Sequence, residues 1–469
     1  MPWAATESNE RLFIENPASD SPVRGSSFLV PMKSTDVSTL LEWHDRSSGI
    51  TTDTRQCGPG MLFFALRGER FNGNEFARQA IQTGCMAAVV DDPDLEGEGL
   101  LLVPDVLKAL QQLARLHRDR FPGPVFGLTG SNGKTTTKEL LLAVLSQKFE
   151  VHGTKGNLNN HIGVPLTLLS MPKDVPFALV EMGANHQGEI AALSRIANPT
   201  HGMITNVGQA HLEGFGGIEG VKKGKQELFV HLAEGQGTAF VPAKDPDLMA
   251  LSDLEGLDTC LFGTPENPPF VWRSGSSPQS PLFWSLDGST TPGPWHKAGR
   301  PTAVQLEGQH QLANMTAAIA VGQYFGVSPE SIAQALMQFQ PVSQRGETVK
   351  TAVNTVIVDC YNANPSSVES TLRSFSGTLP DGPLAILGDM MELGEHAAAG
   401  HKWVRDVCTE CGIECWVVGP LFSAHAEGDK TFEDLGQLQH HLAEHPLQGR
   451  TILLKGSRSM KLEQLVDAL

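Results

Sequence analysis

Long apolar runs are missing from this 469-residue sequence, and no stretch approaches the roughly 20 consecutive apolar residues that a membrane-spanning helix needs. The first residues, MPWAATESNERLF, also lack the basic-then-apolar order of a secretory signal peptide. Cysteine is scarce: the seven cysteines are scattered and odd in number, which argues against a disulfide framework. We therefore expect a cytoplasmic protein with no membrane span.

Positive charge is also in short supply. The chain has 52 Asp and Glu against 35 Lys and Arg, a formal net charge of −17, so its surface repels a polyanion and we expect no nucleic-acid partner. An anionic substrate must therefore be held by local cations. Cys408 and Cys411 form a CxxC pair, but a structural zinc site usually needs a second such pair. Buried thiols are the expected interpretation, and the sequence leaves a metal or redox role open.

The length of the chain exceeds what one hydrophobic core supports, and alternating strand and helix patterns predict three α/β units in tandem. The polar, aperiodic first residues predict a disordered extension, although the sequence leaves open whether Met32 is the true start. Pro122, Gly123 and Pro124 break the pattern after the first unit. The predicted limits are 1–31 for the extension, 32–122 for the first unit, 123–340 for the second and 341–469 for the third.

Each predicted unit has its own pattern. In the first, the runs MAAVVDD and LLLV precede a helix capped by Asp105, which we expect to pack on a small sheet. In the second, VFGLT, FALVEM and HGMITNV predict buried parallel strands, with a helix over 135–149. In the third, VIVD, LAILGD, WVVG and TILLKG predict a Rossmann-like doubly wound sheet. Its predicted helices lie near 366–375, 395–411, 431–445 and 462–469, and the Pro-, Gly- and Ser-rich residues 264–302 predict turns between short β elements.

The segment TGSNGKTTT connects a predicted strand to a predicted helix. Its two glycines allow backbone N–H groups to approach a phosphate, Lys134 supplies a cation, and Thr135 supplies a hydroxyl for Mg²⁺. The strict GxxxxGK[ST] pattern would need glycine where the chain has Leu128, so only the shorter GxxGKT form is present. A glycine-rich turn without a ligand is the alternative, but the strand, loop and helix together favour nucleotide binding. The expected ATP contacts are Gly130, Ser131, Asn132, Gly133, Lys134, Thr135 and Thr136.

Several polar residues beyond this loop are candidates for the same site. Glu181 ends a predicted strand at the carboxyl edge of the sheet, where a Mg²⁺-binding carboxylate is expected, although such residues are usually only solvated. His211, in NVGQAHLEGFG, is either a surface histidine or a ligand for a metal or a phosphate. The basic run that contains Lys225 is, by its spacing alone, typical of a solvated surface. The asparagines of GNLNNHIGVP are either turn residues or contacts for a polar substrate, namely Asn157, Asn159 and Asn160.

In this order, these segments resemble the Mur ligase family of peptidoglycan synthesis. The resemblance runs from about Met32 to the end, and also includes SGITTDTR, GMLFFALRGERFNG, KKGKQELF, DCYNANPSS, LGDMMELG and KGSRS. GNLNN, GANHQGEI and YNANP are similar to the member that joins D-alanyl-D-alanine to UDP-N-acetylmuramoyl-tripeptide. The resemblance implies a UDP-substrate-binding first domain, a central ATPase domain and a Rossmann-like third domain. It also implies that ATP phosphorylates the tripeptide carboxylate and that the dipeptide amine attacks the acyl phosphate, giving the pentapeptide, ADP and phosphate.

The resemblance also implies roles for individual residues. Lys134 would hold the β- and γ-phosphates, Thr135 and Glu181 would hold one Mg²⁺, and His211 would hold a second Mg²⁺. Lys225, in GKQELF, matches the lysine of the family pattern AKxxLF, which CO₂ converts into a carbamate that helps to seat the metals. The resemblance therefore reverses the solvated interpretation of Lys225. The residues expected to be catalytic are Lys134, His211 and Lys225.

The remaining contacts of ATP and the substrates follow from the same resemblance. In GQHQLAN, His310 and Asn314 match adenine-side residues, while Gln311 replaces an asparagine. Arg345 resembles an arginine that reaches the γ-phosphate when the third domain closes, and Asp359 matches the acid that binds the ribose. The expected substrate contacts are Thr52, Asp53 and Arg55 near the uridine diphosphate, Asn157, Asn159 and Asn160, and Asn362, Asn364 and Asp389 near the dipeptide or nucleotide.

Two other functions are consistent with parts of the sequence. Another ligase of the superfamily, such as the enzyme that adds the third amino acid or folylpolyglutamate synthase, would share the central-domain residues, and the accepted amine distinguishes them. A nucleotide-dependent switch would need only the phosphate loop and no carboxylate substrate. We expect a monomer that acts on small molecules. The sequence leaves open how far the domains swing and whether the third peptide residue is diaminopimelate or lysine.

Overall fold

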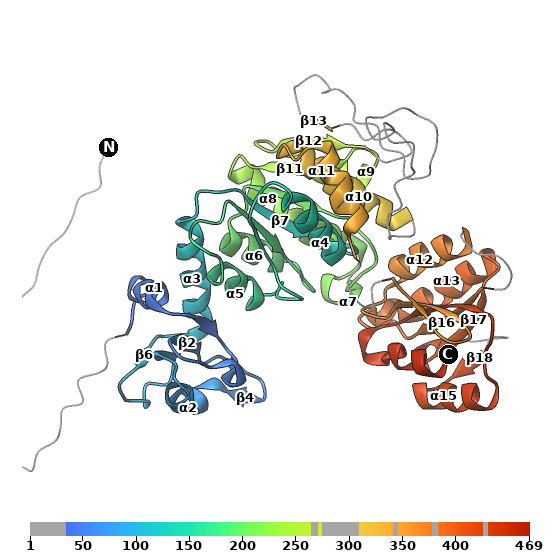
Figure 1. Cartoon of the computed structure of the whole chain (residues 1–469), viewed down its shortest axis with the longest axis horizontal. Coiled ribbons are helices and arrows are strands. Elements are labelled where there is room, and N and C mark those ends of the chain that lie inside the picture. Colours follow the sequence, from blue (N-terminus) through green and yellow to red (C-terminus); the bar gives the residue numbers. More distant parts are fainter. Residues whose placement is uncertain (1–33, 264–270, 274–308, 341–345, 378–382, 425–429) are drawn as a thin grey trace, which may run out of the picture.

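A computed structural model describes residues 34–263, 271–273, 309–340, 346–377, 383–424 and 430–469. The predictions for residues 1–31, for Arg345 and for most of the turns at 264–302 lie outside the described residues. The described chain forms three α/β units, each with a mainly parallel sheet (Figure 1). This confirms the predicted fold class. None of the helices in those ranges has both the length and the apolar character to cross a bilayer.

The first unit is built on a four-stranded parallel sheet in the order β1-β2-β5-β6. Its strands are β1 (Gly49–Thr51), β2 (Met61–Phe64), β5 (Ala87–Val90) and β6 (Leu100–Leu102). A small antiparallel hairpin, β3 (Arg67–Gly68) and β4 (Phe71–Asn72), follows β2. Helix α1 (Val37–Arg46) precedes the sheet, and α2 (Ala77–Gln82) leads into β5.

Helix α3 (Val106–Asp119) begins where the sequence predicts. The Asp105 carboxylate accepts a hydrogen bond from the Lys108 N–H at 2.9 Å and so caps the first turn. Leu110 and Leu113 lie on the buried stripe of the helix and share a hydrophobic core with the inward-facing residues of β2. This shared core connects α3 to the small sheet, although the most extensive contacts of α3 are with α1, α5 and α6.

The same helix also packs against the second unit. It contacts α5 (Gly163–Leu169) and α6 (Glu189–Ala197), which belong to the central part of the chain. The buried Arg118 guanidinium donates hydrogen bonds to the backbone carbonyls of Ala197 at 3.0 Å and Asn198 at 2.7 Å. These carbonyls end α6 and have no partner inside the helix, so Arg118 satisfies them. The helix therefore joins the two units, which the sequence pattern does not predict.

The second unit contains a seven-stranded sheet in the order β13-β12-β11-β10-β7-β9-β8. The β12–β13 pair is antiparallel and the other pairs are parallel. The strands are β7 (Val125–Thr129), β8 (Val151–Gly153), β9 (Phe177–Glu181), β10 (His201–Ile204), β11 (Thr238–Pro242), β12 (Asp258–Phe262) and β13 (Val271–Arg273). Every residue of β7 and β9 is buried, as expected for parallel strands covered on both faces.

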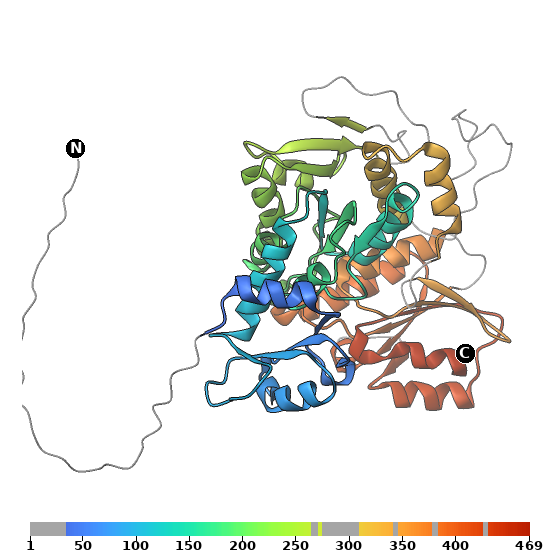
Figure 2. The same cartoon turned by 60° about the vertical axis from the view of Figure 1, so that its left-hand side comes forward.

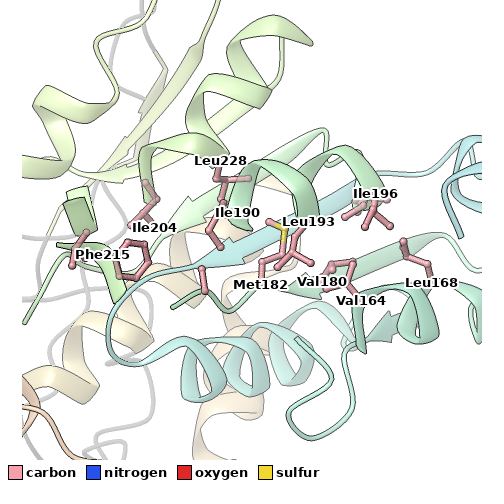
Figure 3. Close-up of a cluster of buried hydrophobic side chains, with 14 of the residues drawn as sticks. Val164, Leu168, Val180, Met182, Ile190, Leu193, Ile196, Ile204, Phe215 and Leu228 are labelled. Atoms are coloured by element: carbon pink, nitrogen blue, oxygen red, sulfur yellow. The ribbon is translucent and has the colours of Figure 1, made fainter. Parts of the chain in front are cut away.

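Alternate side chains of these strands enter two cores, one on each face of the sheet. Phe126 packs with α4 and α10, whereas Val180 packs with α5 and α6. Figure 3 shows the second core, in which Val180 and Met182 lie beneath Leu193. The remaining helices of the unit are α4 (Lys134–Leu145), α7 (Leu212–Phe215), α8 (Ile218–Glu234), α9 (Pro246–Leu251), α10 (Gln309–Tyr324) and α11 (Pro329–Gln338).

The third unit has a six-stranded sheet in the order β14-β15-β19-β16-β17-β18, with β14 antiparallel to its neighbour. Its strands are β14 (Glu347–Lys350), β15 (Thr355–Asp359), β16 (Leu384–Gly388), β17 (Glu414–Val418), β18 (Lys430–Phe432) and β19 (Thr451–Lys455). Its helices are α12 (Pro365–Gly377), α13 (Ala397–Glu410), α14 (Pro420–Ser423) and α15 (Leu435–Glu444). This sheet is the predicted doubly wound one.

Two predicted helices of this unit need correction. The predicted helix at 431–445 begins only at Leu435, because Lys430–Phe432 pairs with β17 and the Asp434 carboxylate caps the helix by accepting from the Gln437 N–H. The segment Leu462–Ala468 is a 3₁₀ helix.

The central unit connects to the other two, which both lie below it in the two views of Figures 1 and 2. The carboxyl ends of β7, β9 and β10 point toward the third unit, and α12 lies close to α10. In parallel α/β sheets this edge is where ligands bind. The fold therefore sets the phosphate loop opposite the third unit.

Candidate active site

A cavity of about 1140 Å³ lies between the central sheet and the third unit. Its central wall is the loop after β7 with the ends of β9 and β10, and its other wall is formed by β15 and the start of α12. A volume of this size accommodates a nucleotide together with part of a second substrate. The cavity-lining residues that the sequence predicts as functional are Ser131, Asn132, Gly133, Lys134, Thr135, Thr136, Asn159, Asn160, Glu181, His211, Asn314, Asp359, Asn362 and Asn364.

The phosphate loop needs glycine at two positions. Gly130 has φ +146°, and a Cβ there would lie 1.9 Å from the Thr205 Oγ1. Gly133 has φ +77° immediately before α4, and a Cβ there would lie 2.7 Å from the Asn314 Oδ1. Leu128, which replaces the first glycine of the strict pattern, is a buried residue of β7 and belongs to the strand. The residue that departs from the strict pattern therefore lies before the loop, and the loop itself keeps its two glycines.

The lysine of this loop lies over its backbone. Lys134 Nζ donates to the carbonyls of Gly130 at 2.7 Å and Ser131 at 3.1 Å. Lys134 also begins α4, so its side chain and the helix N-terminus direct positive charge into the same part of the cavity. An anionic phosphate at this place would be attracted by the Lys134 ammonium group and by the N-terminus of α4.

Glu181 ends β9 and is only 1% exposed. Its Oε1 accepts hydrogen bonds from the Thr135 Oγ1 at 3.2 Å and the Asn159 Nδ2 at 2.8 Å. Its Oε2 is buried and has no hydrogen-bond partner among the described residues, although Lys138 Nζ lies 3.6 Å away. A hydroxyl and an incompletely satisfied carboxylate at one point are oxygen donors of the kind that Mg²⁺ prefers. The residues present therefore fit a magnesium ion.

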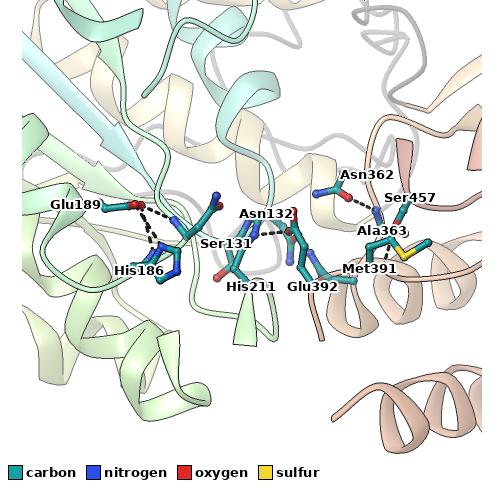
Figure 4. Close-up of polar contacts among 12 residues, drawn as sticks. Ser131, Asn132, His186, Glu189, His211, Asn362, Ala363, Met391, Glu392 and Ser457 are labelled. Atoms are coloured by element: carbon teal, nitrogen blue, oxygen red, sulfur yellow. Dashed lines mark hydrogen bonds and ion pairs between the residues drawn. The ribbon is translucent and has the colours of Figure 1, made fainter. Parts of the chain in front are cut away.

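His211 lies at the start of α7 with φ +54°, and its side chain points toward the third unit. Its Nδ1 lies 2.5 Å from the Oε2 of Glu392, in the loop after β16 (Figure 4). The neighbouring His211 ring lowers the pKa of the Glu392 carboxyl below its ordinary value, which fits this pairing. Glu392 belongs to the LGDMMELG segment, in which only Asp389 was predicted as a contact.

Lys225 is buried in α8 and is 1% exposed, so the solvated interpretation from spacing alone is wrong. Burial, followed by the nearby charge of Lys134, lowers the pKa of Lys225 to about 7. The Lys225 Nζ also lies 5.0 Å from the centre of the Phe215 ring. By contrast, Lys222 on the same helix forms a surface ion pair with Asp247 at 2.9 Å.

Direct hydrogen bonds connect the phosphate loop to the third unit. The Asn364 Nδ2 donates to the Asn132 Oδ1 at 2.7 Å, and the Asn132 Nδ2 donates to the Ser366 Oγ at 3.2 Å. The Gln209 N–H also donates to the Ser366 Oγ, at 3.1 Å. Ser366 is part of the NANPSS segment, but only its asparagines were predicted as contacts. Hydroxyl and amide groups at the start of α12 therefore face the phosphate loop.

The adenine-side residues predicted on α10 are partly described. Asn314 lines the cavity, accepts a hydrogen bond from the Thr137 Oγ1 at 3.1 Å and donates to the Gln311 Oε1 at 3.1 Å. Gln311, the residue that departs from the family pattern, thus holds Asn314 in place. His310 lies in the first turn of α10, and its side chain is outside the described part of the chain.

Asp359 ends β15 and lines the cavity from the third unit. Its carboxylate forms an ion pair with Lys455 at the end of β19, and it accepts a hydrogen bond from the Thr371 Oγ1 at 3.3 Å. Lys455, the lysine of KGSRS, is buried and also lines the cavity, although no role was predicted for it. Asn362 lies two residues before Asn364, and its Oδ1 accepts from the Ala363 N–H at 2.9 Å.

Asp389 caps a helix of the third unit. It is fully buried, does not line the cavity, and accepts hydrogen bonds from the N–H groups of Leu421 at 3.0 Å and Phe422 at 2.9 Å. These are unsatisfied donors at the start of α14, so the carboxylate acts as a helix cap. The structure shows this capping role, and the predicted contact of Asp389 with the dipeptide or nucleotide stays a prediction.

Four other predicted substrate contacts also lie away from this cavity. Thr52, Asp53 and Arg55 follow β1 in the first unit, where the Asp53 carboxylate pairs with the Arg55 guanidinium at 2.7 Å. This hydrogen bond lowers the pKa of Asp53 to about 2. Asn157 is exposed and is not among the cavity-lining residues. The structure therefore leaves their predicted contacts with substrate as predictions.

A phosphate loop at the carboxyl edge of a parallel sheet, beside a buried carboxylate and opposite a second doubly wound unit, defines a nucleotide-binding protein of the P-loop class. Three family models match successive parts of the chain: the Mur ligase family catalytic domain over 46–118, the Mur ligase middle domain over 128–322, and the Mur ligase glutamate ligase domain over 344–458. The chain belongs to the Mur ligase family. This confirms the family that the sequence motifs resemble.

Individual relatives are similar over nearly the whole chain. UDP-N-acetylmuramoyl-tripeptide–D-alanyl-D-alanine ligase from Bacillus subtilis (strain 168) is 35% identical over 437 residues, which cover 90% of this chain and 93% of the relative. A crystal structure of MurF from Acinetobacter baumannii has a TM-score of 0.77 at 30% identity and covers 93% of this chain and 99% of that one. MurF ligase from Thermotoga maritima in complex with ADP has a TM-score of 0.75 at 25% identity, covering 91% and 97%.

Proposed function

We propose that this chain is an ATP-dependent ligase that joins D-alanyl-D-alanine to UDP-N-acetylmuramoyl-tripeptide, giving the pentapeptide, ADP and phosphate. The observation that carries the proposal is the cavity, in which a phosphate loop and a buried carboxylate face a third unit that hydrogen-bonds to the loop. The names of the relatives supply the substrates. A UDP-linked substrate and ATP together assign the reaction to the cytoplasm.

The chemistry follows from the groups around the cavity. The tripeptide carboxylate attacks the γ-phosphorus of ATP, the bond to the β-phosphate oxygen breaks, and ADP leaves. The dipeptide amine then attacks the acyl phosphate carbon, phosphate departs with the former carboxylate oxygen, and the amine loses a proton. Lys134 and the N–H groups of the loop from Gly130 to Thr135 hold the phosphates in this sequence.

The proposal includes two Mg²⁺ sites. Thr135 and Glu181 would hold one ion, and His211 would contribute to the second. When bound, the ions screen the phosphate and carboxylate charges that must meet. In the present arrangement Glu392 pairs with the His211 Nδ1, so this nitrogen could bind a metal only after Glu392 moves away.

Lys225 is suited to carbamate formation. A carbamate forms when an unprotonated amine attacks CO₂ and releases a proton, and an exposed lysine is almost fully protonated near neutral pH. Because the pKa of Lys225 is about 7, the Lys225 amine is unprotonated in about half of the molecules at pH 7. We assign the carbamate at Lys225 a role in seating the metals beside Lys134.

The substrate contacts complete the proposal. Asn314 with His310 would face the adenine, Asp359 the ribose, and Arg345 the γ-phosphate. The first unit, with Thr52, Asp53 and Arg55, would hold the uridine diphosphate, while Asn159, Asn160, Asn362 and Asn364 would face the peptide substrates.

Amine selectivity tests the proposal against its relatives in the superfamily. The purified protein is incubated with ATP, Mg²⁺ and UDP-N-acetylmuramoyl-tripeptide that ends in either diaminopimelate or lysine, and ADP and the product mass are followed. We expect ADP and pentapeptide only when D-alanyl-D-alanine is present. Turnover with a free diamino acid or glutamate instead would overturn the substrate assignment, and ADP release that is independent of any carboxylate would indicate a nucleotide switch.

A further inference from the structure

Two buried histidines that do not line the cavity face each other where α1, α3 and the end of α5 meet. Figure 1 shows these three helices. His44 of α1 is 9% exposed and His117 of α3 is 4% exposed. Their ring centroids are 4.8 Å apart in an edge-to-face arrangement. Asp45 follows His44, and one ligand atom of each of the three residues lies within 4.8 Å of the others.

Backbone carbonyls fix which ring nitrogen carries the proton. The His44 Nε2 lies 2.9 Å from the carbonyl oxygen of Leu169, and the His117 Nε2 lies 3.1 Å from that of Met171. A carbonyl oxygen only accepts, so each Nε2 must be the N–H donor and each neutral ring keeps a lone pair on Nδ1. This is the arrangement of metal-binding histidines, whose second nitrogen commonly donates to a backbone carbonyl.

Both Nδ1 atoms are buried, and neither has a hydrogen-bond partner within the described ranges. The His44 Nδ1 lies 3.9 Å from the Asp45 Oδ1, beyond hydrogen-bond distance. A buried polar nitrogen without a partner is costly, and two of them in one place are more than ordinary packing requires. Burial lowers the pKa of both rings, that of His117 to about 4, so both lone pairs are available at neutral pH.

We propose that His44, His117 and Asp45 form a binding site for one Zn²⁺ or a similar borderline divalent ion, which would fasten helix α1 to helix α3. Imidazole nitrogens and a carboxylate suit this class of ion, and water would complete its coordination. Tetrahedral bonds of about 2.0–2.1 Å set ligand atoms about 3.4 Å apart, so the three groups need to close by about 1.4 Å or less. Side-chain rotation can provide this movement.

Two cations oppose the ion. Lys173 Nζ lies 3.0 Å from Asp45 and the Arg120 guanidinium lies 2.9 Å from it. Both cations would compete with the metal ion for the Asp45 carboxylate and would repel the ion. The site should therefore bind zinc more weakly than a closed structural site does. This predicts that removing the Lys173 charge strengthens binding, an effect that simple histidine packing would not produce.

Zinc binding to the full chain tests the site. Chelator-treated protein in saturating Mg²⁺ is titrated with Zn²⁺ against a chromophoric chelator, and Co²⁺ spectra report whether the ligands are nitrogen and oxygen or thiolate. We expect His117→Gln to bind one ion fewer than the unmodified chain. The matched control is His152→Gln, because His152 also contacts a carbonyl, of Thr167 at 2.8 Å, but no other imidazole of the described residues forms a ring contact with it. Equal stoichiometry in His117→Gln and the unmodified chain would overturn the proposal.

Two surface substitutions keep the test independent of folding. Asp45→Asn should weaken Zn²⁺ binding at least tenfold, and Lys173→Gln should strengthen it several-fold. Zn²⁺ should also raise the unfolding temperature of the unmodified chain but not of Asp45→Asn. Unchanged affinity in both variants, or a thiolate spectrum with Co²⁺, would refute the assignment. These outcomes do not depend on ligase activity, so they leave the proposed function untouched.

Discussion

Replacing Lys225 by methionine should stabilise the metal-free protein while removing its ligase activity. The side chain is 1% exposed and burial lowers its pKa from 10.5 to about 7. At about 1.4 kcal/mol for each tenfold loss of proton affinity, holding this lysine in the fold at pH 7 costs about 4 kcal/mol relative to the unfolded chain. Methionine has a similar length and no charge to desolvate, so Lys225→Met should recover up to about 4 kcal/mol of unfolding free energy.

The pH dependence of this gain has a definite sign. The unfolded chain binds the proton of Lys225 more tightly than the folded one, so the stability of the unmodified protein rises with pH between about 7 and 10.5. The penalty is full below pH 7 and is lost above pH 10.5. The advantage of Lys225→Met should therefore fall from about 4 kcal/mol at pH 7 to about 1 kcal/mol at pH 9.5.

Urea unfolding in CO₂-free, chelator-containing buffer at pH 7 and pH 9.5 measures this difference. Lys222→Met is the matched control, because Lys222 lies on the same helix but pairs with Asp247 at the surface. That variant should show no stabilisation. A gain for Lys225→Met that is equal at both pH values, or a loss at pH 7, would refute the reasoning from burial.

Three further predictions concern the cavity. Gly130→Ala should abolish nucleotide binding and destabilise the fold by more than Gly188→Ala, because both have positive φ but only the first new Cβ meets another atom, as measured by nucleotide titration and thermal unfolding. Glu181→Gln should weaken Mg²⁺-dependent binding of ATP at least tenfold while leaving Mg²⁺-free binding nearly unchanged, and an equal loss in both would contradict the metal role. Glu392→Gln should shift the Mg²⁺ dependence of ADP production to lower Mg²⁺ by freeing His211, whereas a requirement for more Mg²⁺ would show that Glu392 itself supports the metal.

Local chemistry made much of the fold predictable. Asp105 caps α3 because a carboxylate before an amphipathic run satisfies free N–H groups, and that signal lies within four residues. The strand–loop–helix around Lys134 is equally local. The strand Lys430–Phe432 was missed because it is a short edge strand, and its pairing with β17 depends on residues far away in the sequence.

The site was predictable only where a motif marks it. The spacing around Lys225 is typical of a solvated run, and only the resemblance to a family indicated otherwise, because the burial of Lys225 is set by the tertiary packing of α8. Asp389 was grouped with the substrate contacts because it lies in a shared motif, yet its carboxylate caps α14. The roles of Glu392 and Lys455 could not be predicted, because their partners His211 and Asp359 are far away in the sequence.

The most direct test of the proposed mechanism follows an oxygen atom. UDP-N-acetylmuramoyl-tripeptide labelled with ¹⁸O in its terminal carboxylate is incubated with ATP, Mg²⁺, D-alanyl-D-alanine and the protein, and the released phosphate is analysed by mass spectrometry. Because the carboxylate oxygen bridges carbon and phosphorus in the acyl phosphate and leaves with phosphorus, we predict one ¹⁸O in each phosphate, together with ADP and pentapeptide. Unlabelled phosphate, or AMP in place of ADP, would contradict the account.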